Sequence, residues 1–415
     1  MTIGTPQLLV SMGVGVPAGD LWILDDPVRS RLDAGYVLAG DVTPVDLADT
    51  AFSVSITRGR NDRFTEEINP GLMVVRLRNR DRRYDPSYAD GPYYGLLDPG
   101  REISFALDYH RLFTGRIDDW SLEWSPTGES TAVITASDPL AQLARAEMDY
   151  NEWSVQYPHE RIQAVLDLPE VEWTESVVID PGHNQLQDDI TADGTNVLGY
   201  LQLVARSDLG MLFADRNGGL RFRSRTKITE ASGAYAWTFS DDPGSVHELK
   251  FTGLVGVTGG SSLYGRVVVT AMNGGDPQPY TNSASWSAYG KRTLSLDVLL
   301  NTDAQALDMA TALADLYAVP RNRVTSLDFL GHSTNDFQRL ASWDVELGDA
   351  VSVTYTPNGV GDPMSDRYIV EGISHQIGPA EHFVSLSLGD RGRTDTWILD
   401  DPERSKLDAG YVLAY

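Results

Sequence analysis

Apolar and polar residues alternate with the period of a β-strand through much of the first third of the chain. In LMVVRLRNR, residues 72–80, Val75 and Leu77 fall on one face, and the arginines at 76, 78 and 80 fall on the other. An alternation of this kind is typical of a strand with one buried face. The same pattern predicts strands over residues 51–57, 72–80, 101–109, 112–124 and 130–137.

A helix is predicted directly after the last of these strands. Asp138 is suited to cap a helix, and Pro139 is suited to its first position, at the start of the run DPLAQLARAEM. Gly128 marks the turn before the preceding strand. The strands and the helix together predict a compact β-barrel closed by a helix over residues 49–148.

Residues 149–235 have a mixed pattern. The runs HERIQAVLDL and TNVLGYLQLVARS have helical periodicity. The run MLFADRNGGLRFRSR predicts a hairpin, because Asn217-Gly218 is a strong turn signal between two apolar stretches. We therefore expect a mixed α+β insert domain here.

Strand patterns return over residues 236–390, where we predict a second β-barrel. One helix, expected over 302–319, interrupts these strands, with Thr302 and Gln305 forming a capping box and Pro320 ending the helix. The last strands are DAVSVTYT, DRYIVEGISHQI and HFVSLSLGD. The predicted fold class is mainly β with an α+β insert, in the order arm, barrel, insert, barrel, arm.

The two arms, residues 1–48 and 391–415, contain a repeated segment. WILDDPVRSRLDAGYVLA at 22–39 and WILDDPERSKLDAGYVLA at 397–414 differ only at Val28/Glu403 and Arg31/Lys406. The apolar positions, which are unchanged, are the candidate contact residues: Trp22, Ile23, Leu24, Leu32, Tyr36, Val37, Leu38, Trp397, Ile398, Leu399, Leu407, Tyr411, Val412 and Leu413. We predict that both copies dock on partner surfaces through these anchors. The alternative is that both pack on the body of their own chain.

Composition narrows the function classes. The 415 residues carry a formal net charge of −26 and no cysteine, which excludes disulfides and thiolate chemistry. The acidic balance argues against nucleic-acid binding but suits a surface past which DNA slides; solubility alone is the simpler explanation. No apolar run reaches membrane-spanning length, and the first residues lack a basic signal region. We expect a soluble protein with no membrane anchor.

A cluster of arginines stands out in this acidic chain. It consists of Arg58, Arg60, Arg63, Arg76, Arg78, Arg80, Arg82 and Arg83. We predict that these residues are candidates for a subunit interface with an acidic face of a neighbouring chain. A solvated strand face with internal ion pairs is the main alternative, and contact with DNA is a third.

Several stretches resemble one known family. RGRNDRFTEEINPGLMVVRLRNRDRRYDP, GPYYGLLDPGREISF, LFTGRIDDWSLEW and GMLFADRNGGLRFRSR, with the ending LGD…RYIVEGISHQI, resemble minor tail proteins of long-tailed phages (siphoviruses) of actinobacteria. A WILDDP…LD…VLA element is also similar to C-terminal tails in that family. The resemblance covers residues 50–415, whereas the N-terminal copy of the repeat departs from it.

The resemblance implies a baseplate hub, similar to the hub of T-even baseplates. It implies two tube-type β-barrels joined by smaller mixed domains, and three chains presenting six barrels to a six-fold tail tube. The implied partners are the chain itself as a homotrimer, the tail tube, the distal tail protein and other minor tail proteins. DNA would pass through an acidic channel without specific binding. The implied place is the tail tip of the virion, after synthesis in the host cytoplasm.

An enzymatic function is the main competing class. VVIDPGH at 177–183 resembles the start of a zinc-dependent peptidoglycan amidase, and His247 lies 64 residues after His183. That family has a glutamate ligand soon after the first histidine, whereas here Asp188 or Asp189 would have to substitute. We expect a simple turn at 181–182 instead, with no catalytic residue, no metal and no cofactor.

Two further alternatives stay open. Paired aspartates are compatible with a glycosidase, and Tyr88, Tyr93 and Tyr94 are compatible with a receptor-binding tail protein. His375 and His382, on successive predicted strands, are expected to be core or surface histidines rather than a metal pair. The favoured hypothesis is a structural, non-enzymatic hub.

Overall fold

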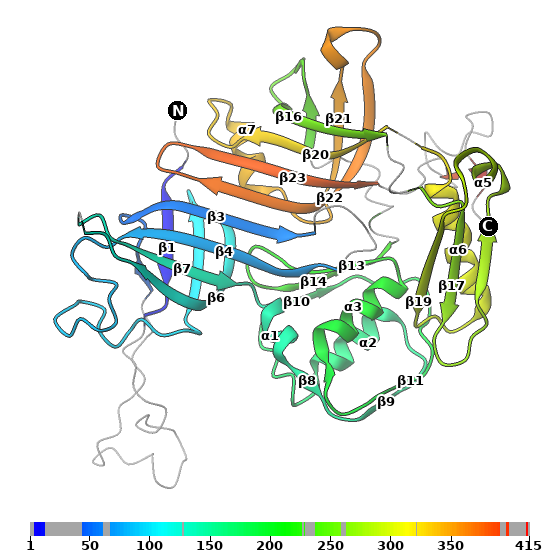
Figure 1. Cartoon of the computed structure of the whole chain (residues 1–415), viewed down its shortest axis with the longest axis horizontal. Helices are drawn as coiled ribbons and strands as arrows, with labels where there is room; N and C mark the ends of the chain where they lie inside the picture. The colour runs from blue at the N-terminus through cyan, green and yellow to red at the C-terminus, as the bar shows by residue number, and fades with distance from the viewer. Residues whose placement is uncertain are drawn as a thin grey trace.

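The computed structural model describes residues 4–12, 44–60, 67–126, 128–225, 228, 237–258, 263–320, 322–390, 396–397 and 412–413. The chain forms two β-barrel-like bodies side by side, with an insert and a small α/β domain beside them (Figure 1). The mainly β class with an α+β insert is therefore confirmed. Among the described residues, no helix is long and apolar enough to cross a membrane.

The first body is a curled antiparallel sheet with its strands in the spatial order β2–β1–β5–β6–β7–β4–β3. Its strands are β1 (Pro6–Val10), β2 (Val45–Asp46), β3 (Ala51–Gly59), β4 (Asn69–Arg78), β5 (Glu102–Leu107), β6 (His110–Glu123) and β7 (Thr131–Ser137). Along β4 the predicted alternation holds: Met73, Val75 and Leu77 are wholly buried, and Arg76 and Arg78 are exposed. One face of this sheet therefore encloses an apolar core.

The N-terminal residues 6–10 belong to this sheet, although the sequence placed them within an arm. Strand β1 pairs with β5, and Leu8 and Val10 are wholly buried. With β5 on one side and the short β2 on the other, two buried apolar residues at alternate positions anchor this five-residue strand. The docking segment 22–39 lies outside the described residues.

The second body is a closed barrel with the strand order β22–β21–β15–β16–β20–β23, in which β23 pairs again with β22. Its elements are β15 (Trp237–Ser240), β16 (Glu248–Thr258), β20 (Asn322–Leu330), α7 (Asp336–Asp344), β21 (Ala350–Tyr355), the 3₁₀ turn η1 (Pro357–Gly359), β22 (Met364–Ile377) and β23 (His382–Asp390). The three final strands confirm the prediction for this part of the chain.

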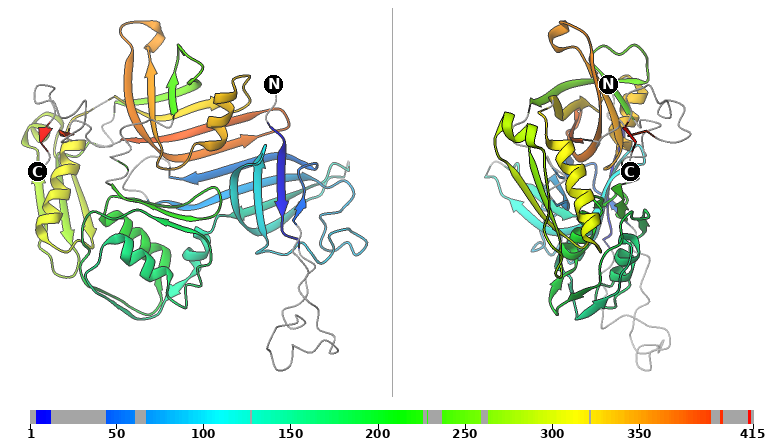
Figure 2. Two further views of the ribbon diagram at one scale, coloured as in Figure 1. Left: turned by 180° about the vertical axis from the view of Figure 1, so that it is seen from behind. Right: turned by 90° about the vertical axis from the view of Figure 1, so that its right-hand side faces the viewer.

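The two bodies share one continuous sheet, because β3 pairs antiparallel with β22 from Gly59↔Gly372 to Ile377↔Val54 (Figures 1 and 2). Gly59 adopts a φ of +89°, and a Cβ there would lie 2.2 Å from the carbonyl oxygen of Glu371. Only glycine suits both the conformation and the close approach. The barrels are thus fused directly, while the insert that separates them in sequence lies to one side.

The insert supplies α1 (Leu140–Arg145), β8 (Glu147–Met148), β9 (Asn151–Trp153), α2 (Pro158–Leu166), β10 (Val177–Ile179), β11 (Asp189–Thr191), β12 (Thr195–Asn196), α3 (Val197–Ser207), β13 (Met211–Ala214) and β14 (Leu220–Arg223). The predicted helices and the hairpin are all present. Helix α1 was expected to close the first barrel. Instead, Leu140 and Leu143 enter the core that the insert shares with the second barrel, because the chain leaves the first sheet at this point.

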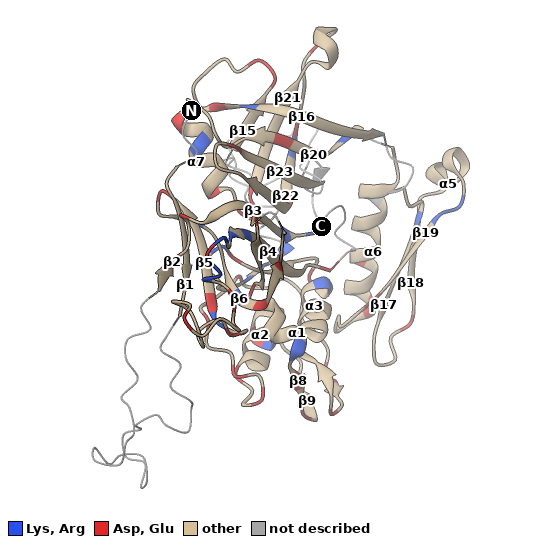
Figure 3. Cartoon of the chain, turned by 60° about the vertical axis from the view of Figure 1, so that its left-hand side comes forward, with Lys and Arg blue, Asp and Glu red and all other residues tan. Residues whose placement is uncertain are grey.

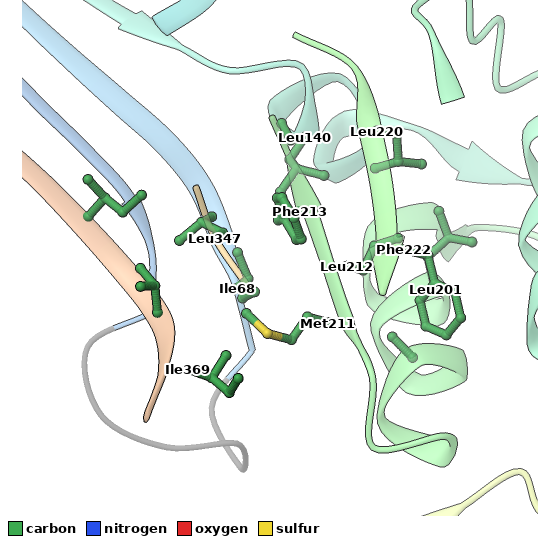
Figure 4. Packing of buried hydrophobic residues seen from close by; sticks show 14 of the residues in the cluster. Ile68, Leu140, Leu201, Met211, Leu212, Phe213, Leu220, Phe222, Leu347 and Ile369 are labelled. Atoms are coloured by element: carbon green, nitrogen blue, oxygen red, sulfur yellow. The ribbon is translucent and has the colours of Figure 1, made fainter. Parts of the chain in front are cut away.

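The β13–β14 hairpin packs on both of its sides. Figure 4 shows Phe213 and Met211 directed toward Ile68, while Leu212 and Phe222 lie toward Leu201 of α3. The predicted turn at Asn217-Gly218 lies within a five-residue loop between the two strands. Asp215 holds it, since its carboxylate accepts from the backbone N–H groups of residues 217 and 219 at 2.9 and 3.0 Å.

A small α/β domain interrupts the second barrel. It contains β17 (Arg266–Ala271), β18 (Gln278–Thr281), α5 (Ser283–Tyr289), β19 (Thr293–Val298) and α6 (Asp303–Tyr317), with its own core. The predicted helix is confirmed as α6, and Thr302 caps it by accepting from the backbone N–H of Gln305 at 3.3 Å. The expectation of a single helix in this region was wrong, since α5 and α7 also form; both are shorter than ten residues.

Of the C-terminal arm, the structure describes β24 (Thr396–Trp397) and β25 (Val412–Leu413). These two strands pair in parallel, with Trp397 opposite Leu413. The first and last contact candidates of the second repeat copy therefore lie side by side in this strand pair. A third candidate, Val412, lies opposite Thr396, and Ile398, Leu399, Leu407 and Tyr411 lie outside the described residues.

Candidate functional site at the joint between the barrels

A buried carboxylate joins three distant parts of the chain. Glu346, in the loop between α7 and β21, is 8% exposed. Its Oε1 lies 2.7 Å from Nη1 of Arg58 on β3, and its Oε2 lies 3.0 Å from Nε of Arg216 in the β13–β14 loop. The first barrel, the insert and the second barrel therefore meet at one side chain.

The charges at this joint support one another. Burial alone would raise the pKa of Glu346, but the guanidinium groups of Arg58 and Arg216, with the backbone N–H of Leu347, lower the pKa to about 2. Glu346 is thus ionised at every physiological pH. Arg58 is 3% exposed, so both partners of the pair are desolvated.

Arg216 extends the network back to the first barrel. Its Nη1 lies 3.2 Å from Oδ1 of Asp344, and its guanidinium also donates to the backbone carbonyls of Trp343 and Asp344. The same Oδ1 of Asp344 lies 3.0 Å from Nδ1 of His110 on β6, whose ring packs 4.9 Å from that of Trp343. The joint is therefore a chain of contacts across the barrels.

A second buried ion pair crosses the β3–β22 pairing. Arg60 Nε lies 2.8 Å from Oε2 of Glu371, and both side chains are almost fully buried. Buried pairs of this kind add little net stability over apolar packing, but losing one partner is costly. Together, Arg58 and Arg60 hold the two barrels in one orientation within the chain. The burial of each side chain is explained by these contacts, without a second subunit.

The exposed arginines of the predicted cluster pair with nearby acids. Figure 3 shows these charges on β4 and the loop that follows it. The ion pairs are Arg76–Glu123 at 3.0 Å, Arg80–Glu129 at 2.5 Å, Arg82–Asp85 at 2.7 Å and Arg83–Asp81 at 2.6 Å. Arg78 lies over the Phe52 ring at 5.7 Å. This arrangement matches a solvated face with internal ion pairs; the subunit interface stays a prediction, and Arg63 lies outside the described residues.

The histidines singled out from the sequence fall in separate places. The backbone N–H of His183 donates to Oδ1 of the buried Asp208 at 2.8 Å, and the His247 ring packs edge-on against Phe337 at 5.1 Å. Among the described residues, no group of three His, Cys, Asp or Glu side chains is placed to hold a metal ion. The absence of enzymatic activity stays a prediction.

His375 and His382 come together in the core at the joint. Nδ1 of His375 lies 3.0 Å from Nε2 of His382, and the two side chains are 2% and 0% exposed. Burial, reinforced by His382, holds the pKa of His375 well below its usual range. Burial and the neighbouring His332 lower the pKa of His382 to about 3. The expectation of core histidines is confirmed for this pair.

The tyrosines that suggested receptor binding divide between core and surface. Tyr93 stacks on the wholly buried Tyr84 with ring centroids 5.6 Å apart. Tyr88 lies under the Arg82 guanidinium at 4.8 Å, whereas Tyr94 is 55% exposed. Two of the three therefore have partners within the chain.

Sequence reasoning missed the centre of this joint. Glu346, Arg216 and Asp344 carry no motif, and the two barrels that they connect lie hundreds of residues apart in sequence. The one available signal was the turn-flanked run DVELGD at 344–349, which places three carboxylates beside apolar residues expected in the core.

The fold, but not the sequence, is similar to that of known proteins. No protein-family model matches the sequence, and no curated protein matches it. The fold is similar to a tail protein from Neisseria meningitidis MC58, with a TM-score of 0.61, 12% identity, and coverage of 93% of this chain and 96% of that one. It is also similar to the 43 kDa tail protein of prophage MuSo2 from Shewanella oneidensis, with a TM-score of 0.57, 14% identity, and coverage of 93% and 98%. The chain has the fold of these phage tail proteins.

Proposed function

We propose that the chain is a structural baseplate hub protein of a phage tail. The observation that carries the proposal is the fused pair of barrels, which aligns nearly end to end with two tail proteins. A tail component transmits load between neighbouring rings. The shared sheet and the buried Glu346 network suit that task, because they leave the two barrels little freedom to rotate.

In this proposal three chains form a ring that presents six barrels. Such a ring would join a six-fold tail tube to a three-fold tip. The net charge of −26 supports a channel wall that repels DNA and lets it pass without specific binding. The proposed partners are the tail tube, the distal tail protein and other minor tail proteins.

The finer assignment rests on the sequence resemblance described above. We place the protein in the virion of a siphovirus of actinobacteria, at the tail tip, after synthesis in the host cytoplasm. We also propose a structural rather than a catalytic role, and assign no cofactor.

The test is the mass of the assembled protein. Native mass spectrometry of the purified chain, or of isolated tail tips, is expected to give a trimer. A protein that is monomeric in solution and present in tails at any copy number other than a multiple of three would contradict the ring. Digestion of host cell wall in a zymogram would contradict the structural role.

The repeated segment gives a separate prediction. We propose that each copy docks on a partner through its apolar anchors, so that Trp397→Ala weakens tail assembly while leaving thermal unfolding of the isolated protein unchanged. Burying a large apolar side chain contributes roughly 1.5–3 kcal/mol, which is lost from the docking contact alone. Trp22→Ala and the double variant extend the series. Normal assembly combined with a large fall in melting temperature would show that the repeats belong to the chain's own core.

A further inference from the structure

The small α/β domain is electrically polarised. Strands β17 and β19 run parallel, with Arg266 opposite Thr293 at one end and Ala271 opposite Val298 at the other. Arg266, Lys291 and Arg292 gather where these strands begin. Asp276, Asp297 and Asp303 lie toward the opposite end, which abuts the insert through a hydrogen bond from Asn273 to Oδ1 of Asp189 at 3.0 Å.

Two of these cations lie over one indole ring, and the third is joined to them through the backbone. Arg266 Cζ lies 6.0 Å and Lys291 Nζ 5.2 Å from the centroid of Trp286 on α5, and the backbone N–H of Arg266 donates to the carbonyl of Arg292 at 3.1 Å. A Cβ at Gly265 would lie 2.3 Å from the indole, so the ring is packed tightly against the start of β17. We call Arg266, Trp286, Lys291 and Arg292 the basic corner.

Within the part of the chain that the structure describes, the basic corner has no acidic partner. Lys291 and Arg292 are exposed, and no carboxylate of the described residues lies within ion-pair distance of any of the three cations. On and after β4, by contrast, four neighbouring arginines, Arg76, Arg80, Arg82 and Arg83, each pair with a carboxylate. Three neighbouring cations without a carboxylate among the described residues, in a chain of net charge −26, therefore indicate a surface suited to an acidic partner.

The insert carries a matching acidic surface. Residues 147–196 contain twelve Asp and Glu and one basic residue, Arg161, which is fully buried. Five of these acids gather along β8, β9 and the turn before β12, where the backbone N–H of Asp149 donates to Glu170 at 3.3 Å and that of Tyr150 to Asp193 at 2.6 Å. We call these residues the acidic edge: Glu147, Asp149, Glu152, Glu170 and Asp193.

Both surfaces have apolar anchors among their charges. In the acidic edge Tyr150 is 53% exposed, and Ile190 on β11, opposite Glu152, is 63% exposed. Beside the basic corner, Tyr289 is 44% exposed. Figure 3 shows the basic residues at the α5 end of the small domain and acidic residues along β8 and β9. Aromatic centres ringed by charge are typical of protein interfaces.

We propose that the basic corner of one copy docks on the acidic edge of the next copy, and that this contact closes the trimeric ring. The inference rests on the proposed trimer and names its interface. A ring requires two different, complementary patches on each chain, which these two surfaces provide. DNA is the other polyanion present in a tail, but a chain of net charge −26 repels it at long range, whereas a protein edge meets the corner through short-range contacts.

Charge reversal at the corner tests the proposal. Lys291→Glu with Arg292→Glu is expected to raise the dissociation constant of the trimer by roughly 100-fold, because two like-charged surfaces would face each other. The trimer of the unaltered protein is expected to weaken as the salt concentration rises from about 0.1 M to about 1 M, where the Debye length shortens from about 10 Å to about 3 Å. Sedimentation equilibrium measures both effects.

Two further variants make the result specific. Adding Glu147→Lys and Asp149→Lys to the corner variant is expected to restore the trimer, since the charges are then exchanged across the contact. Arg111→Glu with Lys250→Glu is the matched control. Both residues are exposed and lie on separate barrels, and the net charge changes by the same amount. This control is expected to trimerise normally.

The outcomes separate this contact from the hub itself. If the unaltered protein forms a trimer that charge reversal at the corner does not affect, the contact is wrong and the ring stands. If the unaltered protein never forms a trimer, the proposed hub fails and the contact fails with it. If a DNA duplex binds the unaltered protein and the corner variant loses that binding while remaining trimeric, the corner is a polyanion site and the inference is overturned.

Discussion

Replacing Glu346 with glutamine is expected to lower the free energy of unfolding by about 3–5 kcal/mol, the cost of breaking a buried ion pair by removing one partner. Arg58 would then lie in the joint without a counter-charge, while Arg216 would keep only its ion pair with Asp344 at 3.2 Å. The side chain of Arg58 is nearly inaccessible to water, so solvent cannot replace the lost carboxylate. The shift is measured as a lower urea midpoint, followed by circular dichroism.

The matched control is Glu129→Gln. Glu129 pairs with Arg80 at 2.5 Å, yet both side chains are about two-thirds exposed. Water replaces this contact, so the variant is expected to unfold at the same urea concentration as the unaltered protein. Equal shifts for the two variants would mean that the joint is no more than another surface ion pair.

Acid is expected to destabilise the barrels through the buried pair of His375 and His382. The pKa of each is lowered in the folded chain, so the unfolded chain takes up protons that the folded chain does not. The two neutral histidines therefore leave the stability of the fold unaffected above pH 6.5, and they lower the free energy of unfolding as the pH falls below 6.5. Each histidine that stays neutral costs about 1.4 kcal/mol of stability per pH unit in this range.

Three buried aspartates have the opposite effect on stability as the pH falls. Burial raises the pKa of Asp138 to about 7 and raises the pKa values of Asp208 and Asp349. The folded chain therefore binds protons at these groups more readily than the unfolded chain, which raises the free energy of unfolding as the pH falls. The stabilisation from Glu346 is lost only below pH 4.5. The informative measurement is therefore a difference between two proteins, taken between pH 6.5 and pH 5.

The comparison uses His375→Gln with His382→Gln, in which two amides can keep a hydrogen bond. Relative to this variant, the unaltered protein is expected to lose stability as the pH falls from 6.5 to 5. His183→Gln, at an exposed position, should leave the profile unchanged. Should the double variant fail to fold, NMR titration of the imidazole protons gives the answer. Rings that titrate near pH 6.5 would contradict the prediction.

Many strands and helices of this protein could be predicted, because their signals are local, whereas β1, α5 and α7 were missed. The alternation along β4, the cap at Thr302 and the turn before Gly218 each act over a few residues. The fusion of the barrels could not be predicted, since nothing in the sequence of β3 specifies β22, more than 300 residues away, as its neighbour. The same limit explains why α1 was assigned to the first barrel although its leucines enter the insert core.

The candidate site was predictable only in part. The arginine cluster was visible as composition, but the division between Arg58, buried against Glu346, and Arg80, exposed beside Glu129, depends on tertiary packing. The histidine pair was visible as two residues on neighbouring strands, and their antiparallel pairing then brought the rings together. Pairing partners far apart in sequence decide which charged residues become structural.

The β1–β2 pairing has a consequence for how the N-terminal repeat copy is carried. Val10 lies opposite Val45, so the segment of sequence between them begins and ends at neighbouring positions on the sheet. The conformational entropy of closing such an excursion grows slowly with its length, by about 0.6 kcal/mol for each doubling. Segments of very different size could therefore be exchanged at this position, and the barrel would carry a new adaptor without any change in its own strands.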